Sequence, residues 1–367
     1  MSGRPSFSCL AALAVLLLAG CAGLEVAQPP APPPTPEARP LPPPGPPAPP
    51  APPTPAPPTT RAAPPTHVRF FPDFVAVIAQ PGDTLSSLAA RYLDDPSLDW
   101  RIAEFNGIST LKPGQGVIVP FKPLDVGGVT PRGYQTVPVL VYHKFSKQTS
   151  DRMTVRQDAF EEQMAFLKRN GYRVITLDDL FEFLDGKRPI PRRSVVITFD
   201  DGWRSMYDIA YPILKRYGYP ATLFVSTDLI HSTSTTLDWN KIREMVRNGI
   251  DIQCHGKTHR SLGKIENGET LQAYFEAVKA ELTESAKIVK RQLGKDVKYL
   301  AYPFGDTNSL LIGILGKLGF EGGLTVVRAG NPFFADDFRV GRSMIYGDFD
   351  LRAFENNLRW ISDEGLK

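Results

Sequence analysis

Apolar residues from position 137 onward follow two different spacings, and each spacing predicts a different kind of element. Short runs of β-branched and aromatic residues predict strands, whereas apolar residues three or four positions apart predict helices. The predicted strands are 137–142, 173–175, 195–199, 221–225, 250–254, 297–301 and 323–326. Helices fall between them, and the last predicted helix runs through Phe354, Leu358 and Trp360. This alternation predicts an α/β fold with a parallel sheet, a distorted (β/α) barrel of about seven strands.

A shorter pattern of the same kind precedes the barrel. Its predicted elements are a strand over 74–78, helices over 85–92 and 98–105, and a closing strand over 117–120. Asp83 and Thr84 stand where helix-capping residues are expected. We therefore expect a β-α-α-β domain over 74–121, joined by a linker over 122–136 to the larger domain over 137–367.

The amino terminus has the pattern of an export signal. The apolar run Leu10–Leu18 follows Arg4 and is too short to cross a bilayer, which predicts a signal peptide over 1–20. Its ending, Leu18-Ala19-Gly20-Cys21, resembles the bacterial lipobox and implies cleavage before Cys21 and lipidation of its sulfur. The alternative is an ordinary signal peptide with a chance cysteine.

Proline dominates residues 28–66, where large apolar side chains are nearly absent. Such a segment cannot bury a core, so we expect residues 21–73 to form the lipidated cysteine and an extended tether. At about 3.1 Å per residue, the proline-rich part would reach roughly 120 Å. The alternative is a ligand for proline-binding modules.

Cysteine usage and charge narrow the function classes. If Cys9 leaves with the signal and Cys21 carries lipid, Cys254 is the one thiol left, so no disulfide framework is expected. The formal net charge is +3 and no basic stripe is present in the sequence. Nucleic acid is therefore not an expected partner.

Two adjacent carboxylates, Asp200 and Asp201, follow the predicted strand 195–199 and precede Gly202. The segment reads as β-α-β, which places both acids at the carboxyl end of a parallel strand, where ligands bind. Gly202 allows the strand to stop there, so both side chains can share one site. The alternative is a solvated turn.

Two histidines, His255 and His259, follow the strand 250–254. They are not a zincin helix, because Gly256 stands where that motif has its glutamate. Together with Asp201 they would form a three-ligand site of the kind that holds catalytic zinc, or ferrous iron in oxygenases. The spare carboxylate of Asp200 favours a hydrolase, since a hydrolase needs a base beside its water. The alternative is that both histidines are ordinary core or surface residues.

A third turn, Tyr302-Pro303-Phe304-Gly305, follows the strand 297–301 and would leave main-chain N–H groups facing a developing oxyanion. With the Thr198–Gly202 and His255–His259 motifs, it makes the chain resemble the NodB-like polysaccharide deacetylases (carbohydrate esterase family 4). The opening 137–143 resembles a branch that includes exopolysaccharide deacetylases.

This resemblance implies roles for the motif residues. Asp200 would be the general base, Asp201, His255 and His259 the metal ligands, and Phe304 the oxyanion N–H donor. The implied metal is Zn²⁺, with Co²⁺, Ni²⁺ or Fe²⁺ as alternatives. We also expect Tyr302, Pro303 and Trp239 to contact the substrate.

The sequence departs from the family pattern at two places, and the second concerns the general acid. The arginine that usually precedes the third motif is replaced by Ala301, and the Leu-x-His motif that supplies the general acid is missing. His143 and His231 are the remaining histidines of the domain that could protonate the leaving amine. We assign His143, because it follows the first predicted strand and should share a rim with Asp201. The alternative is that His143 is a hydrogen-bonded residue that shapes the floor of the pocket.

The smaller domain resembles LysM domains in its Gly82–Ser86 start, the central Asn106 and the Pro113–Pro120 ending. The resemblance implies binding of N-acetylglucosamine-type chains, with a spacer that has lost glycan affinity as the alternative. The whole chain then predicts an envelope lipoprotein that is anchored through Cys21 and deacetylates a GlcNAc-containing polymer, peptidoglycan or an exopolysaccharide. A non-catalytic glycan-binding lipoprotein and a ferrous oxygenase are the rival classes.

Overall fold

The structure is a computed structural model that describes residues 67–123, 125, 127–131 and 133–364. The predicted signal peptide, Cys21 and the proline-rich tether up to residue 66 lie outside these residues. Within the described part, no helix combines the length and apolarity needed to cross a membrane.

The smaller domain is a three-stranded antiparallel sheet with two α-helices and a short 3₁₀ turn. Its elements are β1 (Val68–Phe70), β2 (Phe74–Ile78), α1 (Leu85–Leu93), η1 (Pro96–Leu98), α2 (Asp99–Asn106) and β3 (Gly116–Pro120). The predicted β-α-α-β order is confirmed, and β1 is an additional strand that pairs with β2. The Asn106 side chain bonds to both main-chain groups of Ile118 and to the Ile102 carbonyl. It therefore ties α2 to β3, with Val75, Leu88 and other apolar side chains forming the core.

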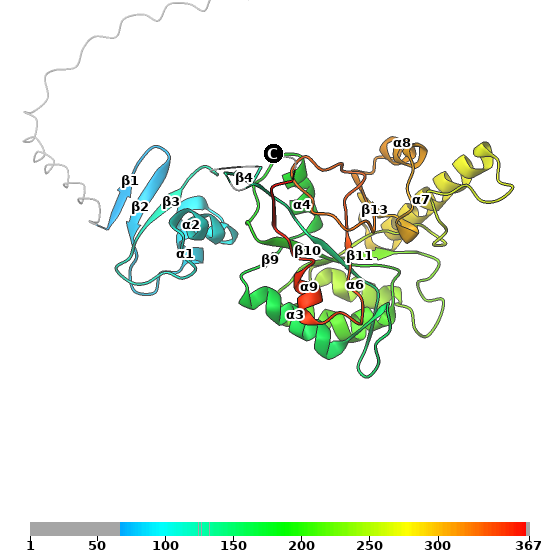
Figure 1. The fold of residues 1–367 in the computed structure, drawn as a ribbon, viewed down its shortest axis with the longest axis horizontal. Coiled ribbons are helices and arrows are strands. Elements are labelled where there is room, and N and C mark those ends of the chain that lie inside the picture. The colour runs from blue at the N-terminus through cyan, green and yellow to red at the C-terminus, as the bar shows by residue number, and fades with distance from the viewer. Residues whose placement is uncertain (1–66, 124, 126, 132, 365–367) are drawn as a thin grey trace, which may run out of the picture. The chain divides into compact units, whose positions relative to one another are not determined.

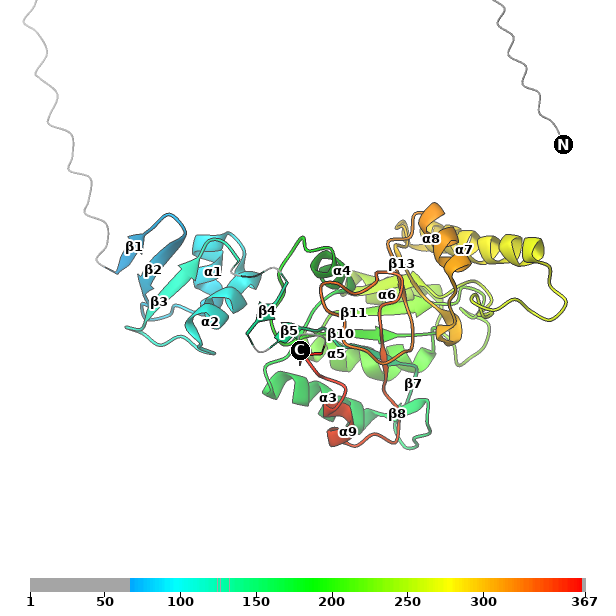
Figure 2. The ribbon, with the colours of Figure 1, turned by 45° about the horizontal axis from the view of Figure 1, so that its top comes forward.

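The larger domain is built on a parallel sheet, part of which is labelled in Figures 1 and 2. Its strand order is β14-β13-β12-β11-β10-β6-β15. The strands are β6 (Val139–Tyr142), β10 (Ser194–Phe199), β11 (Ala221–Val225), β12 (Ile250–Cys254), β13 (Tyr299–Ala301), β14 (Gly322–Leu324) and β15 (Ser343–Met344). Every pair in this path is parallel, and the central strands are buried on both faces. The predicted distorted barrel is thus confirmed as a curled sheet of seven parallel strands.

The segment 340–344 contacts both edges of this sheet. Val340 exchanges main-chain hydrogen bonds with Gly323 and Thr325 beside β14, and β15 pairs with β6 at the opposite edge. The strand predicted over 173–175 is confirmed as β9 (Arg173–Val174), which pairs with β10 outside the seven-stranded path. The seventh place in that path belongs to β15, in this closing segment 340–344, where no strand was predicted.

Helices cover the sheet between successive strands. They are α3 (Gln157–Arg169), α4 (Leu177–Leu184), α5 (Tyr211–Tyr217), α6 (Trp239–Arg247), α7 (Leu271–Leu293), α8 (Ser309–Lys317) and α9 (Leu351–Glu355). A π-helical turn, η2 (Met206–Ala210), leads into α5, and Pro212 near the junction lacks the N–H for a regular α-helical bond. Figures 1 and 2 both place α9 beside α3, where the Phe166 and Phe354 rings meet edge to face.

The predicted carboxyl-terminal helix is shorter than expected. α9 ends at Glu355, so Leu358 and Trp360 lie outside it, and β16 (Ile361–Ser362) pairs with β5 (Gly133–Gln135). β5 also pairs with β4 (Val129–Thr130), and β7 (Lys144–Ser146) pairs with β8 (Thr154–Arg156) in a separate two-stranded sheet. The helical spacing of Phe354, Leu358 and Trp360 therefore continued beyond the true end of the helix. The chain after α9 is extended at β16, where it pairs with β5.

Candidate metal and catalytic site

The end of β10 turns sharply and brings two carboxylates to one edge of the barrel. Asp201 has a positive φ of 75°, and the Gly202 N–H bonds to the Asp200 carbonyl at 2.9 Å. Gly202 has a φ of 103°, and a Cβ there would lie 2.6 Å from Ile230 Cδ1. The turn therefore requires glycine at position 202, and it aims Asp201 away from the strand direction of Asp200.

Asp201, His255 and His259 converge across the ends of β10 and β12. Asp201 Oδ1 lies 3.4 Å from His255 Nε2 and 3.2 Å from His259 Nε2, and the three ligand atoms all lie within 4.8 Å of one another. A tetrahedral ion with bonds of about 2.0–2.1 Å would place its ligand atoms about 3.3 Å apart. Asp201 Oδ1 is also buried without a hydrogen-bond partner among the described residues. The spacing and this unpaired oxygen fit a divalent cation.

Neighbouring groups orient the ligand atoms inward. The His255 Nδ1 atom lies 2.8 Å from the Ala301 carbonyl, which can only accept, so a neutral ring presents Nε2 to the site. Trp203 Nε1 donates to Asp201 Oδ2 at 2.8 Å and leaves Oδ1 for the two imidazoles. Burial lowers the pKa of His255, but the charge of Asp200 and the Asp201 carboxylate raise it overall. The site therefore favours positive charge.

The same balance applies to Asp201. Burial raises the pKa of its carboxyl, but contact with the His255 and His259 imidazoles outweighs burial and leaves the pKa well below its usual range. Asp201 is consequently ionised at neutral pH, which is the state required of a metal ligand.

Arg342 is the functional residue that the sequence reasoning missed. Its side chain is 0% exposed, and its two terminal nitrogens donate to Asp200 Oδ1 at 2.7 Å and Oδ2 at 2.8 Å. Its Nε donates to the Thr325 carbonyl at 3.0 Å. Burial raises the pKa of Asp200, but the Arg342 charge lowers it overall, so Asp200 stays ionised. Arg342 lies in the closing segment, whose sequence carries no pattern that pointed to a site.

His143 leaves β6 beside Asp200. The β6–β10 register pairs Tyr142 with Phe199, so the next residues on each strand emerge at the same edge. Burial lowers the pKa of His143, and the negative charges of Asp200 and Asp201 oppose that effect. The neutral imidazole is thus favoured relative to an exposed histidine.

The third predicted turn exposes one ring. Phe304 has a φ of 62° and is 63% exposed, and its ring centroid lies 4.8 Å from that of His259. The turn's hydrogen bonds use the N–H groups of Gly305 and Asp306, not that of Phe304. Phe304 therefore lies beside His259, and its main-chain N–H group is not used by the hydrogen bonds of the turn.

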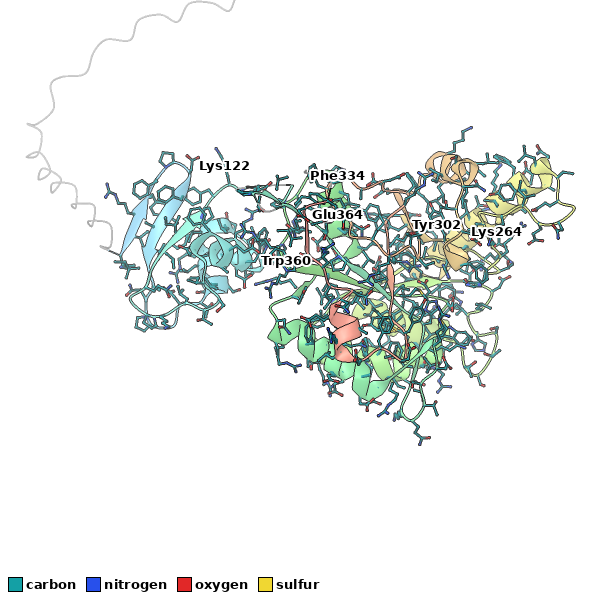
Figure 3. All side chains as sticks on the ribbon, viewed as in Figure 1. Lys122, Lys264, Tyr302, Phe334, Trp360 and Glu364 are labelled. Atoms are coloured by element: carbon teal, nitrogen blue, oxygen red, sulfur yellow. The ribbon has the colours of Figure 1, made fainter. Side chains whose placement is uncertain are left out.

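The residues predicted to contact the substrate are buried or half-buried, whereas His231, the alternative general acid, is exposed. Tyr302 is fully buried with its hydroxyl donating to the Phe338 carbonyl, and Figure 3 marks it among the side chains of the larger domain. Pro303 is buried as well, so a substrate would meet this turn through its main chain or Phe304. Trp239 is half-buried and packs on the main apolar cluster, and His231 is exposed.

Comparisons with known proteins match both domains. The family model described as polysaccharide deacetylase matches residues 187–323, and the LysM domain model matches residues 77–120. Residues 187–323 are thus similar to polysaccharide deacetylase domains, and residues 77–120 are similar to LysM domains, as the motifs predicted.

Individual relatives agree with this assignment. YxkH of Bacillus subtilis is 31% identical over 190 residues, which cover 52% of this chain and 64% of the relative. The chain thus spans less than two thirds of that relative's length. A poly-β-1,6-N-acetyl-D-glucosamine N-deacetylase of Staphylococcus aureus is 28% identical over 226 residues, covering 60% of this chain and 76% of the relative.

Solved structures share the fold. IcaB from Ammonifex degensii aligns with a TM-score of 0.54 and 25% identity, covering 60% of this chain and 94% of that one. The Streptococcus pyogenes deacetylase PplD, in complex with acetate, aligns with a TM-score of 0.55 and 23% identity, covering 61% of this chain and 98% of that one.

Proposed function

We propose that the chain is a metal-dependent N-deacetylase of a GlcNAc-containing polysaccharide. The observation that carries this proposal is the convergence of Asp201, His255 and His259 beside the separately held, ionised carboxylate of Asp200. A metal-binding triad beside a base suits hydrolysis, in which water must be activated next to an electrophile. The name of the Staphylococcus aureus relative supports poly-β-1,6-N-acetyl-D-glucosamine as the first substrate to test.

Each residue has a role in this proposal. A divalent ion held by Asp201, His255 and His259, with Zn²⁺ favoured and Co²⁺, Ni²⁺ or Fe²⁺ as alternatives, would supply Lewis acidity to water and the acetamide carbonyl. Asp200 accepts the proton of the attacking water, and the Phe304 N–H donates to the developing oxyanion.

His143 completes the proton transfers in this proposal. It donates a proton to the departing amine nitrogen, so acetate and a glucosamine unit result. The β6–β10 register supports this role because it places His143 beside the base. Since burial lowers the His143 pKa, only a minor protonated fraction would be present near neutral pH.

Arg342 supports the assignment of Asp200 as base. The arginine expected before the third motif is absent, with Ala301 in its place, but Arg342 in the closing segment donates to both oxygens of Asp200. A bidentate guanidinium fixes both oxygens of a carboxylate in one plane. This pairing argues against a degenerate deacetylase that only binds glycan.

The remaining predictions concern location and domain organisation. We propose that residues 74–121 bind GlcNAc chains, that 137–367 form the catalytic domain, and that 122–136 link them. Export over 1–20 and a lipid on Cys21, followed by the tether to residue 73, would hold the enzyme in the cell envelope. Membrane fractionation of a Cys21→Ser variant tests the anchor, and a variant that stays with membranes would contradict it.

Acetate release tests the central proposal. The purified chain should release acetate from poly-β-1,6-GlcNAc, peptidoglycan or chitin oligomers, with one polymer preferred, and a chelator should abolish the release. Binding without acetate release, with metal present, would support the non-catalytic alternative. Oxygen consumption coupled to glycan oxidation would instead support a ferrous oxygenase.

A further inference from the structure

The loop that carries both histidines is hydrogen-bonded to a residue of α7, the long helix drawn in yellow in Figure 1. Glu281 on this helix is only 7% exposed. Its Oε2 accepts the main-chain N–H groups of Lys257 at 2.7 Å and Thr258 at 2.9 Å. Its Oε1 accepts the Thr258 hydroxyl at 2.8 Å. One buried carboxylate thus binds three donors of the segment between His255 and His259.

The opposite side of the loop is held by the chain after β11. The N–H groups of Thr227 and Asp228 donate to the carbonyls of Gly256 and Lys257 at 3.3 and 2.9 Å. In these two bonds the carbonyls of the loop accept, whereas Glu281 accepts from the loop's N–H groups at Lys257 and Thr258. The loop is therefore fixed from both sides, and the α7 side depends on one side chain.

The two histidines differ in how their rings are held. His255 bonds to the Ala301 carbonyl through Nδ1, as a metal-binding histidine commonly does. Among the described residues, the His259 ring has no comparable hydrogen bond to a main-chain carbonyl, and it contacts Asp201 and the rings of His255 and Phe304. The position of His259, which has a φ of 68°, is consequently set by the path of its loop.

A buried carboxylate is costly unless donors satisfy it, and main-chain N–H groups are strong partners for an ionised one. Gly256 leaves room for this contact, because a Cβ there would lie 3.3 Å from Glu281 Oε2. Loss of the carboxylate would leave two main-chain N–H groups without their partner and free the loop on its α7 side. The loop would then have to become ordered when the cation binds, and the entropy cost of that ordering would weaken cation binding.

We propose that Glu281 is a positioning residue that orders the 255–259 loop before a divalent cation binds and thereby sets the affinity of the site for that cation. This inference rests on the metal site of the proposed function. It assigns Glu281 no contact with substrate or with the reacting atoms.

The test is the Zn²⁺ affinity of the metal-free full chain, measured by competition with a chromophoric chelator. Glu281→Ala should weaken Zn²⁺ binding about 10-fold to 100-fold, the usual effect of removing a group that orients a ligand. Glu281→Gln should weaken it much less, because the amide oxygen can still accept both N–H groups. Glu284→Ala, on the same helix but with a half-exposed side chain paired to Lys287, is the matched control and should bind as the unchanged chain does.

Hydrogen exchange separates loop ordering from general destabilisation. In the metal-free protein, the Lys257 and Thr258 amides should exchange faster in Glu281→Ala, while the amides of β11 and β12 keep their protection. If Glu281→Ala does not fold, Thr258→Val removes one of the three contacts and should still weaken Zn²⁺ binding several-fold relative to the Glu284→Ala control.

The outcomes are distinguishable. If the unchanged chain binds no Zn²⁺, the proposed metal site fails. If the unchanged chain binds Zn²⁺ and Glu281→Ala, or Thr258→Val in its place, binds it within about twofold, the proposed role of Glu281 is wrong while the metal site stands.

Discussion

The two halves of the candidate site are assembled differently. On the metal side, Asp201, His255 and His259 lie in the short segments that follow β10 and β12, within two short sequence motifs. On the base side, Asp200 depends on Arg342, which lies 142 positions further along the chain. The metal side is thus a local product of two strand ends, whereas the base side exists only once the barrel closes. Recognisable motifs need not contain every group that a site requires.

The largest expected effect is on the metal side. Asp201→Ala, His255→Ala and His259→Ala should each lose bound metal and fall to background acetate release, because each removes one of three ligands. Metal analysis and a glycan assay on folded protein check both losses. A variant that retains metal and full activity would remove that residue from the triad.

On the base side, Asp200→Asn should retain metal and lose roughly 10²–10⁴-fold in kcat, the usual contribution of a positioned base. The amide keeps the shape of the carboxylate but cannot accept the proton. Parallel metal analysis and steady-state kinetics separate this result from damage to the triad. Near-normal turnover would place the base elsewhere.

His143→Ala should also retain metal and lose roughly 10²–10⁴-fold in rate. Deprotonation of the acid with rising pH gives the alkaline limb of the rate profile, so this limb should flatten in the variant. His231→Ala is the matched control and should keep the limb. The opposite pair of profiles would identify His231 as the acid.

Arg342→Lys should have a smaller effect, roughly 10-fold to 10²-fold on kcat, because lysine keeps the charge but not the bidentate geometry. Combined with Asp200→Asn, the lysine variant should add little further loss, since both changes act on the same carboxylate. Additive losses in the double variant would show that Arg342 acts independently of the base.

The smallest effect on turnover is expected from the smaller domain. Deletion of 74–121 should leave kcat on short oligomers within about twofold but reduce sedimentation with insoluble glycan, if this domain binds GlcNAc chains. Unchanged sedimentation would make the domain a spacer.

The sequence predicted what local patterns encode. The bounds of β12 were predicted correctly, because Ile250, Ile252 and Cys254 alternate with polar neighbours over the whole strand. β15 was missed because two residues carry no detectable alternation, and its pairing with β6 depends on the whole barrel. Arg342 was missed because a charged residue outside the predicted elements is ordinarily solvated. Its burial also depends on the position of the closing segment in the whole barrel.

The closing segment has a consequence for the order in which the domain folds. Contacts between distant parts of a chain form late, because loop closure costs entropy before the contact stabilises anything. The metal ligands follow β10 and β12, so none of them lies in the segment 340–344. Asp200, by contrast, would be a carboxylate without its cation until Arg342 in this segment docks against it. The base is therefore held in place only after the last part of the barrel has taken up its position.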